Sequence, residues 1–195
     1  MIDIQLDQTH SAYVHPSTLG SDDKGKAVPN VIRGEAMLQC ARLMPESAPP
    51  PLWAEIAGIE GKADCWNIWT YRPPSVVTFD IGIARPGTGA LEGDRSQGVT
   101  GHNTHAVTPE TETSCHHFWV AARNFAVDDE ALTEKLSSVR SAFLEDKAMC
   151  EAQQRTIAAY PGAASIDLNS DKPTIEARHM VDRQIAAEQA PRSGP

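Results

Sequence analysis

The stretch 128–159, DDEALTEKLSSVRSAFLEDKAMCEAQQRTIAA, carries the strongest helical pattern in the sequence. It begins with acidic residues and continues with leucines at helical spacing, which predicts one long helix. Asp146 falls on the apolar stripe of this helix, and a carboxylate turned towards a protein interior needs a hydrogen-bonding partner or a cation. At about 100° per residue, that stripe is roughly 60° wide and contains Leu132, Leu136, Val139, Phe143, Cys150 and Ile157.

The segments on either side of this helix complete the fold prediction. A short helix is expected over 2–14, ended by Pro16, and a second shorter helix over 172–188. Strands followed by a long helix indicate an α+β fold, in which an antiparallel sheet is covered by the C-terminal helix. We expect one domain over residues 1–189 and a disordered tail over 190–195. Strands are predicted where apolar, β-branched and aromatic residues lie between Gly or Pro, at 36–44, 65–71, 75–83 and 113–125.

Composition excludes several classes of function. The 195 residues are 41% hydrophobic, which is ordinary for a globular protein, and the net charge is −9. An acidic chain is a poor ligand for nucleic acid or anionic membrane, so neither is expected as a partner. No apolar run is long enough to span a bilayer and no signal peptide is recognisable, which predicts a cytoplasmic protein. The four cysteines lie far apart without a C-x-x-C pair, so we expect reduced packing residues.

Two histidines near the N-terminus are candidate metal ligands. His10 and His15 are five residues apart, and Asp7 lies three residues before the first. In a regular helix the two imidazoles would diverge by about 140°, so they converge only if the helix loosens or contains a π-bulge. Pro16 directly afterwards favours such an irregular end. Taken alone, the spacing is equally typical of two ordinary histidines.

Together with Asp146, the two histidines would form a 2-His-1-carboxylate triad. Such a triad binds ferrous iron and leaves coordination positions open for dioxygen. An alternative partner for Asp146 is an Arg or a group of backbone donors at the sheet. Asp7 is a candidate to orient an imidazole by accepting its second N–H, or to serve only the electrostatics of a helix terminus.

Three segments resemble the catalytic domain of Rieske non-haem iron oxygenases, in the vanillate O-demethylase and dicamba monooxygenase branch. The first is Asp7-x-x-His10-x-x-x-x-His15-Pro-Ser-Thr-Leu-Gly. The second is THAVTPETETSCHHFW over 104–119, followed by Arg-Asn-Phe at 123–125. The third is Glu-Asp-Lys at 145–147, leading to Glu-Ala-Gln-Gln at 151–154.

The resemblance implies a helix-grip, START-like domain in which His10, His15 and Asp146 bind Fe(II). It implies that Asp7 is the bridging aspartate that passes electrons from a Rieske cluster in a neighbouring subunit, which also implies a homotrimer. His105 matches a histidine that contacts substrate, although a polar residue at a strand end is the alternative. His116 and His117 would point to opposite faces of a strand, so at most one lines the pocket and packing is expected for both. Ile4 departs from the family, which tends to have Asn there.

The implied activity is that of an oxygenase component, a non-haem Fe(II) monooxygenase. It would hydroxylate or O-demethylate an aromatic substrate, such as a methoxylated aromatic acid, with O2. A [2Fe-2S] Rieske cluster needs Cys-x-His and a later Cys-x-x-His, and the second pattern is not found in this sequence. Electrons would therefore come from an external Rieske or ferredoxin-type donor and its reductase. Two alternatives are a truncated remnant acting as a small-molecule binding module, and a zinc hydrolase with the same three ligands.

Overall fold

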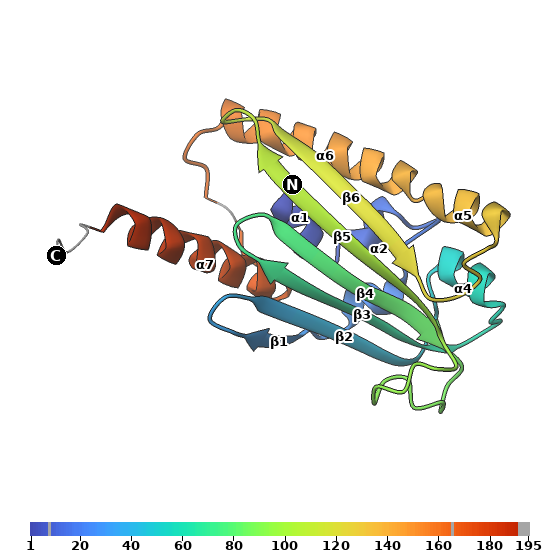
Figure 1. Ribbon diagram of the computed structural model, residues 1–195. Helices are drawn as coiled ribbons and strands as arrows, with labels where there is room; N and C mark the ends of the chain where they lie inside the picture. Colours follow the sequence, from blue (N-terminus) through green and yellow to red (C-terminus); the bar gives the residue numbers. More distant parts are fainter. Residues whose placement is uncertain (8, 165, 191–195) are drawn as a thin grey trace.

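The computed structural model describes residues 1–7, 9–164 and 166–190, and its centre is one antiparallel sheet. The six strands lie in the sheet in the order in which they occur in the chain, so each pairs with its sequence neighbour (Figure 1). An antiparallel sheet was predicted, although from four strands rather than six. The strands are β1 Asn30–Arg33, β2 Leu38–Ser47, β3 Ala63–Arg72, β4 Val76–Ala84, β5 Val99–Pro109 and β6 Cys115–Arg123.

The helices gather against one face of the sheet, which makes the fold α+β as predicted. In Figure 1, α5 and α6 follow the β6 edge, and α1 and α2 lie behind the central strands. α7 packs against β2 and α1, and α2 contacts α6. A 3₁₀ turn at Asn169–Asp171 precedes α7. The helices are α1 Ile2–Leu6, α2 Ser11–Val14, α3 Asp22–Lys26, α4 Pro51–Ala57, α5 Glu130–Ser137, α6 Arg140–Ala159 and α7 Lys172–Gln189.

Strand alternation determines which side chains meet the helices. Along β2, the side chains at 38, 40, 42 and 44 are buried, whereas Leu43 is 44% exposed. Cys40 pairs with Trp69 of β3, which in turn pairs with Phe79 of β4, so one row of apolar side chains crosses the inner face. This row joins α1 and α7 in the main core, which contains Leu6, Leu38, Cys40, Trp69, Tyr71, Val77, Phe79, Ala177 and Met180.

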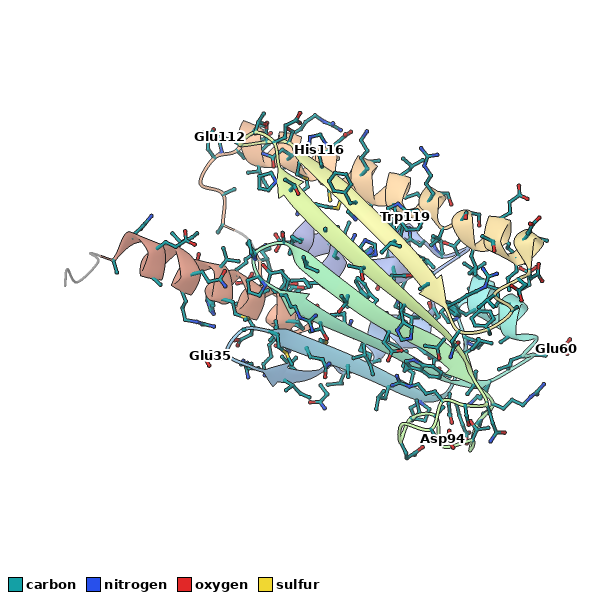
Figure 2. The ribbon with its side chains drawn as sticks, viewed as in Figure 1. Glu35, Glu60, Asp94, Glu112, His116 and Trp119 are labelled. Atoms are coloured by element: carbon teal, nitrogen blue, oxygen red, sulfur yellow. The ribbon has the colours of Figure 1, made fainter. Side chains whose placement is uncertain are left out.

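The opposite face is covered at one end by the long β4–β5 loop. Trp66 is 1% exposed, and its indole N–H donates to Asp80 Oδ1 at 2.9 Å. Asp80 is paired with Arg95, whose guanidinium lies 4.8 Å from the centre of the Trp66 ring. Figure 2 places Asp94 in this loop, at the end of the sheet opposite Glu112 in the β5–β6 turn.

The predicted long helix is interrupted, and the reason lies in its serines. α5 ends at Ser137 and α6 begins at Arg140. The hydroxyls of Ser137 and Ser138 donate to main-chain carbonyls of Thr133 and Lys135, at 2.8 and 2.5 Å. Such side-chain bonds compete with the helix and bend it. The prediction of a buried apolar stripe is wrong at the C-terminal end of α6, where Ile157 is 57% exposed.

Other local predictions differ from the structure in detail. The helix expected over 2–14 is two short helices, α1 and α2, separated at Asp7 to His10. The strands β1 and β5 and the helices α3 and α4 were not predicted. All four cysteines are free, but Cys115 is exposed, so the packing prediction is wrong for that residue. The predicted tail over 190–195 lies, from residue 191 onwards, outside the described residues. Within the described part of the chain, no helix has the length and apolar character needed to cross a bilayer.

Candidate metal centre

The two N-terminal histidines flank a single helical turn. His10 precedes α2 and His15 follows it, with the latter residue at φ −124° and ψ 47°, outside helical geometry. The imidazole centroids are 5.3 Å apart and the rings are nearly perpendicular, at 86°. The irregular end predicted from the five-residue spacing is therefore present, as a helix only four residues long rather than as a π-bulge.

A tight loop after His15 fixes the main chain at this point. The amides of Thr18 and Gly20 donate to the His15 carbonyl at 3.2 and 2.9 Å. The Gly20 backbone lies so close to α2 that a β-carbon there would be 2.1 Å from the Ser11 carbonyl oxygen. Only glycine fits this approach. The loop therefore holds His15, which is 2% exposed, in a buried position.

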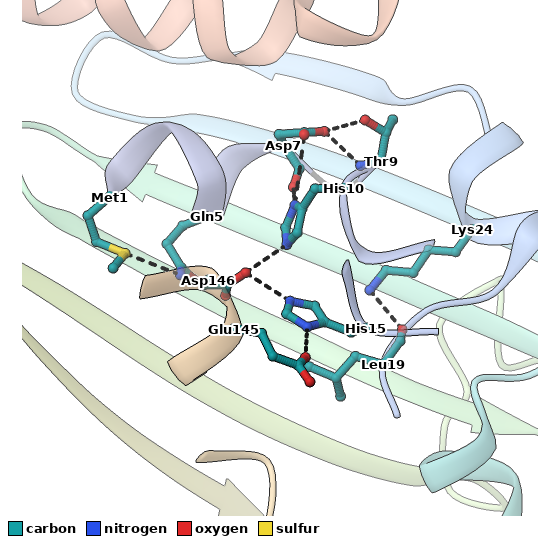
Figure 3. A network of polar contacts seen from close by, with 10 residues as sticks. All are labelled: Met1, Gln5, Asp7, Thr9, His10, His15, Leu19, Lys24, Glu145 and Asp146. Atoms are coloured by element: carbon teal, nitrogen blue, oxygen red, sulfur yellow. Dashed lines mark hydrogen bonds and ion pairs between the residues drawn. The ribbon is translucent and has the colours of Figure 1, made fainter. Parts of the chain in front are cut away.

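Asp146 projects from α6 between the two imidazoles (Figure 3). Its Oδ1 atom lies 2.8 Å from His15 Nε2 and 3.4 Å from His10 Nε2. The carboxylate is 5% exposed, so the stripe geometry that turned it inwards is confirmed. One ligand atom of each residue lies within 4.8 Å of the others, and this is the one such group of three in residues 1–7, 9–164 and 166–190.

The second nitrogen of each imidazole is held by an acceptor. His15 Nδ1 lies 2.6 Å from Glu145 Oε2, and His10 Nδ1 donates to the main-chain carbonyl of Asp7. A neutral imidazole that donates through Nδ1 presents a lone pair at Nε2. Both Nε2 lone pairs then face the Asp146 carboxylate. This arrangement brings three electron-pair donors together and fits a bound cation.

The electrostatics of the site agree with this interpretation. Burial lowers the pKa of His15, but its contacts with the Asp146 and Glu145 carboxylates outweigh burial and raise the pKa above the ordinary 6.5. Burial raises the pKa of Asp146, but its contacts with His10 and His15 reverse this effect and bring the pKa to about 2. Asp146 is therefore a carboxylate at neutral pH, and the pocket around it favours positive charge.

Asp7 lies beside this group but does not orient His10 through its carboxylate. Its Oδ1 accepts from the amide and hydroxyl of Thr9, at 2.7 and 2.6 Å. Its Oδ2 is 3.8 Å from His10 Nδ1, which instead bonds the Asp7 carbonyl. The side chain is 29% exposed. Asp7 thus joins the histidine through the main chain and presents its carboxylate towards the outside of the site.

A cavity of about 250 Å³ opens between the inner face of the sheet and the helices, next to the three converging residues. His105 is on β5 and faces this cavity, 2% exposed, in the middle of a strand rather than at its end. Its ring centroid lies 5.2 Å from both Phe79 and Phe143. Trp119 also lines the cavity, from β6, and packs on Phe143 at 4.9 Å.

The neighbouring histidines take different positions, as strand alternation predicted. His117 is the diagonal neighbour of His105 on β6, with its Nε2 2.9 Å from His105 Nδ1. The side chain of His116 is 58% exposed and lies 3.7 Å from Glu110 Oε1. Burial and the adjacent His117 lower the pKa of His105 to about 4, and burial also lowers the pKa of His117. Both members of the pair are neutral at pH 7.

Sequence reasoning assigned no role at this site to two polar residues, Glu145 and Lys24, and expected only packing for a third, His117. Glu145 contacts His15, His117 contacts His105, and Lys24 lines the cavity from α3. The signal for Glu145 was its position next to Asp146, since neighbouring helix positions can contact the two sides of one imidazole. The others depend on contacts between elements, which no local pattern reveals.

Comparison with known proteins identifies the family. The domain family described as "Vanillate O-demethylase oxygenase C-terminal domain" matches residues 1–187. The chain belongs to this family. The resemblance seen in the three sequence segments is thereby confirmed, and the match covers nearly the whole of this chain.

Individual relatives agree with this assignment. The chain is 39% identical over 193 residues to a toluene-4-sulfonate monooxygenase system iron-sulfur subunit from Comamonas testosteroni, covering 96% of this chain and 56% of that protein. It is 34% identical over 196 residues to a vanillate O-demethylase oxygenase subunit from a Pseudomonas species, covering 97% and 55%. The structure of dicamba monooxygenase bound to 3,6-dichlorosalicylic acid superposes with a TM-score of 0.86 at 28% identity, covering 97% and 56%.

The fold of this vanillate O-demethylase-type domain is thus that of the dicamba monooxygenase catalytic domain. The chain spans about half the length of the curated relatives it matches. One of these relatives is the iron-sulfur subunit of a monooxygenase system and the other is the oxygenase subunit of an O-demethylase. A structure of dicamba monooxygenase contains non-haem iron together with dicamba.

Proposed function

We propose that residues 1–189 form the catalytic domain of a Rieske-type non-haem iron monooxygenase, in which His10, His15 and Asp146 bind Fe(II). The observation that carries this proposal is the convergence of two Nε2 atoms on the Asp146 carboxylate, with both Nδ1 atoms held by acceptors. Two imidazoles and one carboxylate are the ligand set of mononuclear iron oxygenases. A dicamba monooxygenase structure that contains non-haem iron, in a chain 26% identical to this one, supports the choice of iron over zinc.

The reaction is hydroxylation or O-demethylation of an aromatic compound. Ferrous iron supplies the activation of dioxygen. In O-demethylation, one oxygen atom is inserted into a methyl C–H bond, and the resulting O–CH2OH group breaks down to a phenol and formaldehyde. The second oxygen atom leaves as water after taking up two electrons and two protons. A methoxylated aromatic acid is a substrate of the right chemistry.

The residues of the chain have distinct roles in this proposal. Phe79, Phe143 and Trp119 form aromatic walls that hold a ring and exclude water. His105 contacts the substrate from β5. The contact between His105 Nδ1 and His117 Nε2 couples the tautomers of the two rings, because only one of these two nitrogens can carry the shared proton.

Electrons come from a [2Fe-2S] Rieske cluster bound outside this catalytic domain, with a reductase behind it. Asp7 is the bridging residue: its carboxylate is partly exposed and its carbonyl accepts from His10. A homotrimer, in which the cluster of one subunit lies next to Asp7 of its neighbour, is part of the same proposal. The cytoplasm is the compartment in which such a reductase chain operates and in which four unpaired cysteines are stable.

The test is metal content after anaerobic incubation with ferrous ion. The unmodified chain should retain about one iron, whereas His10→Ala and Asp146→Ala should retain almost none. His116→Ala is the matched control, because it removes an exposed histidine outside the site. Retention of iron by both ligand variants, with folds intact by circular dichroism, would overturn the assignment. Oxygen consumption with a supplied Rieske donor and reductase then tests turnover.

A further inference from the structure

Lys24 is a buried cation in the wall of the cavity. Its side chain comes from α3, where Ser21 caps the helix by accepting from the Lys24 amide at 3.2 Å. The residue is 8% exposed and lines the same cavity as His15 and Asp146. Its Nζ donates to the Leu19 carbonyl over a long 3.4 Å (Figure 3). An ammonium group has three donors, and among the described residues no carboxylate forms an ion pair with this one, although the Asp146 carboxylate acts on it over a longer distance.

Arg42 places a second positive charge nearby. It is 2% exposed, and its Nε donates to the Ala27 carbonyl at 3.1 Å. Its Nη1 is buried and has no hydrogen-bond partner among the described residues. Burial, followed by the charge of Arg42, lowers the pKa of Lys24 to about 8. Two neighbouring buried cations without a direct counter-ion are costly, and an anion that enters the cavity would offset that cost.

The charged side chains that line the cavity do not provide a counter-ion for Lys24. Among the described lining residues, the permanently charged side chains are Lys24, Arg123 and Asp146. The Arg123 guanidinium is occupied by main-chain carbonyls, including those of Phe125 at 3.0 Å and Ala126 at 2.7 Å. The Asp146 carboxylate faces the two imidazoles. When Asp146 serves a divalent cation, the cavity wall has a surplus of positive charge.

We propose that Lys24 is a specificity-determining residue that binds the negatively charged group of the substrate, a carboxylate or a sulfonate on an aromatic ring. Arg42 supports it through its charge from behind the cavity wall. The inference rests on the proposed function, because it places the substrate in the cavity beside the candidate iron ligands. The aromatic walls accept the ring, and the ammonium group selects the anion.

The test compares ligands that differ in charge but little in shape. Benzoate, benzenesulfonate and the neutral benzamide are titrated into the chain by calorimetry, with and without Fe(II). The unmodified chain should bind at least one anion about tenfold or more tightly than benzamide. Lys24→Met keeps the length of the side chain and removes the charge, so it should lose this preference while it binds benzamide as before. Lys24→Arg should keep most of the preference.

Lys62→Met is the matched control, because it removes one positive charge at an exposed position outside the cavity. An anion preference that is equal in Lys24→Met and the unmodified chain would overturn the proposal. Whether the sulfonate or the carboxylate binds more tightly identifies the preferred anion. Should Lys24→Met not fold, the ¹³Cε signals of lysine in the unmodified chain decide the matter. One signal should shift with benzoate and not with benzamide, and equal responses would contradict the role of Lys24.

The role of Lys24 and the binding of iron can fail independently, and different measurements test them. The difference in anion preference between the unmodified chain and Lys24→Met, measured in the same metal state, tests Lys24 alone. Iron retention in the unmodified chain and its loss in Asp146→Ala test the metal site alone. An anion preference without iron binding would support the first and contradict the second.

Discussion

His15 Nε2 lies 2.8 Å from Asp146 Oδ1, although 131 positions separate the two residues in the sequence. This contact joins the short helix α2 to the long helix α6. The rest of α6 runs along the β6 edge of the sheet. The N-terminal segment therefore has its main functional partner in the C-terminal half of the chain. Any change that moves α2 relative to α6 should affect the site before it affects the sheet.

Glu145→Ala should weaken Fe(II) binding by about 10- to 100-fold, which is the usual effect of removing a partner that orients a metal-binding imidazole. The reason is the 2.6 Å contact between Glu145 Oε2 and His15 Nδ1. Anaerobic titration with ferrous ion measures the effect. Glu151→Ala is the control, since the one ion pair of Glu151 among the described residues is with Lys147, at 3.6 Å on the exposed side of α6. Equal affinities in the two variants would show that Glu145 does not position His15.

Gly20→Ala should destabilise the chain by about 1–3 kcal/mol, the usual cost of a forced steric overlap. The new β-carbon would lie 2.1 Å from the Ser11 carbonyl oxygen, which is main chain and cannot rotate away. Urea denaturation gives the free energy of unfolding. Gly34→Ala should cost much less, because its nearest neighbour is the flexible Met37 side chain at 3.3 Å. A Gly20 variant as stable as the Gly34 variant would refute the close approach.

His105 should make stability depend on pH. Its pKa is about 4 in the folded chain, against an ordinary 6.5, because burial disfavours the imidazolium. The unfolded chain therefore takes up this proton first as the pH falls. The contribution of His105 is fully present above pH 6.5 and is lost as the pH falls towards 4, by roughly 3 kcal/mol in all.

His105→Gln should flatten this part of the pH profile, measured as the free energy of unfolding between pH 7 and pH 4. His116→Gln should leave the slope unchanged, because that side chain is 58% exposed. A profile with the same slope in both variants would mean that folding does not lower the pKa of His105.

Amide hydrogen exchange should be faster in α1 and α2 than in β3 and β4. Helices of five and four residues have few internal hydrogen bonds, whereas β3 and β4 are paired on both sides. Fe(II) should slow exchange in α2, because the metal would tie His10 and His15 to α6. Exchange in α7 serves as the internal control and should not change. Protection of α2 equal to that of β3 without iron would contradict this expectation.

The sequence was sufficient for the parts of the site that depend on local geometry. The position of Asp146 followed from the period of one helix, and it is 5% exposed. The irregular path between His10 and His15 followed from their spacing and from Pro16. The interruption between α5 and α6 was missed because no Gly or Pro marks it, and the two serines that bend the chain are common inside helices.

The contacts between elements could not be predicted. The pairing of His105 with His117 depends on the β5–β6 register, in which His117 is opposite Val107. The burial of Lys24 depends on the way α3 packs on β2 and α2. A lysine in a five-residue segment rich in charges is usually exposed, so the sequence around Lys24 favours an exposed side chain.

The central claim is that two imidazoles and one carboxylate of this chain bind the same iron. X-ray absorption at the iron edge of the Fe(II)-loaded chain tests it most directly. We predict a spectrum with two imidazole ligands, reduced to one in a His15→Ala sample that still holds some iron, and unchanged in His116→Ala. Iron coordinated by oxygen atoms alone, or a spectrum that His15→Ala leaves unaltered, would contradict it.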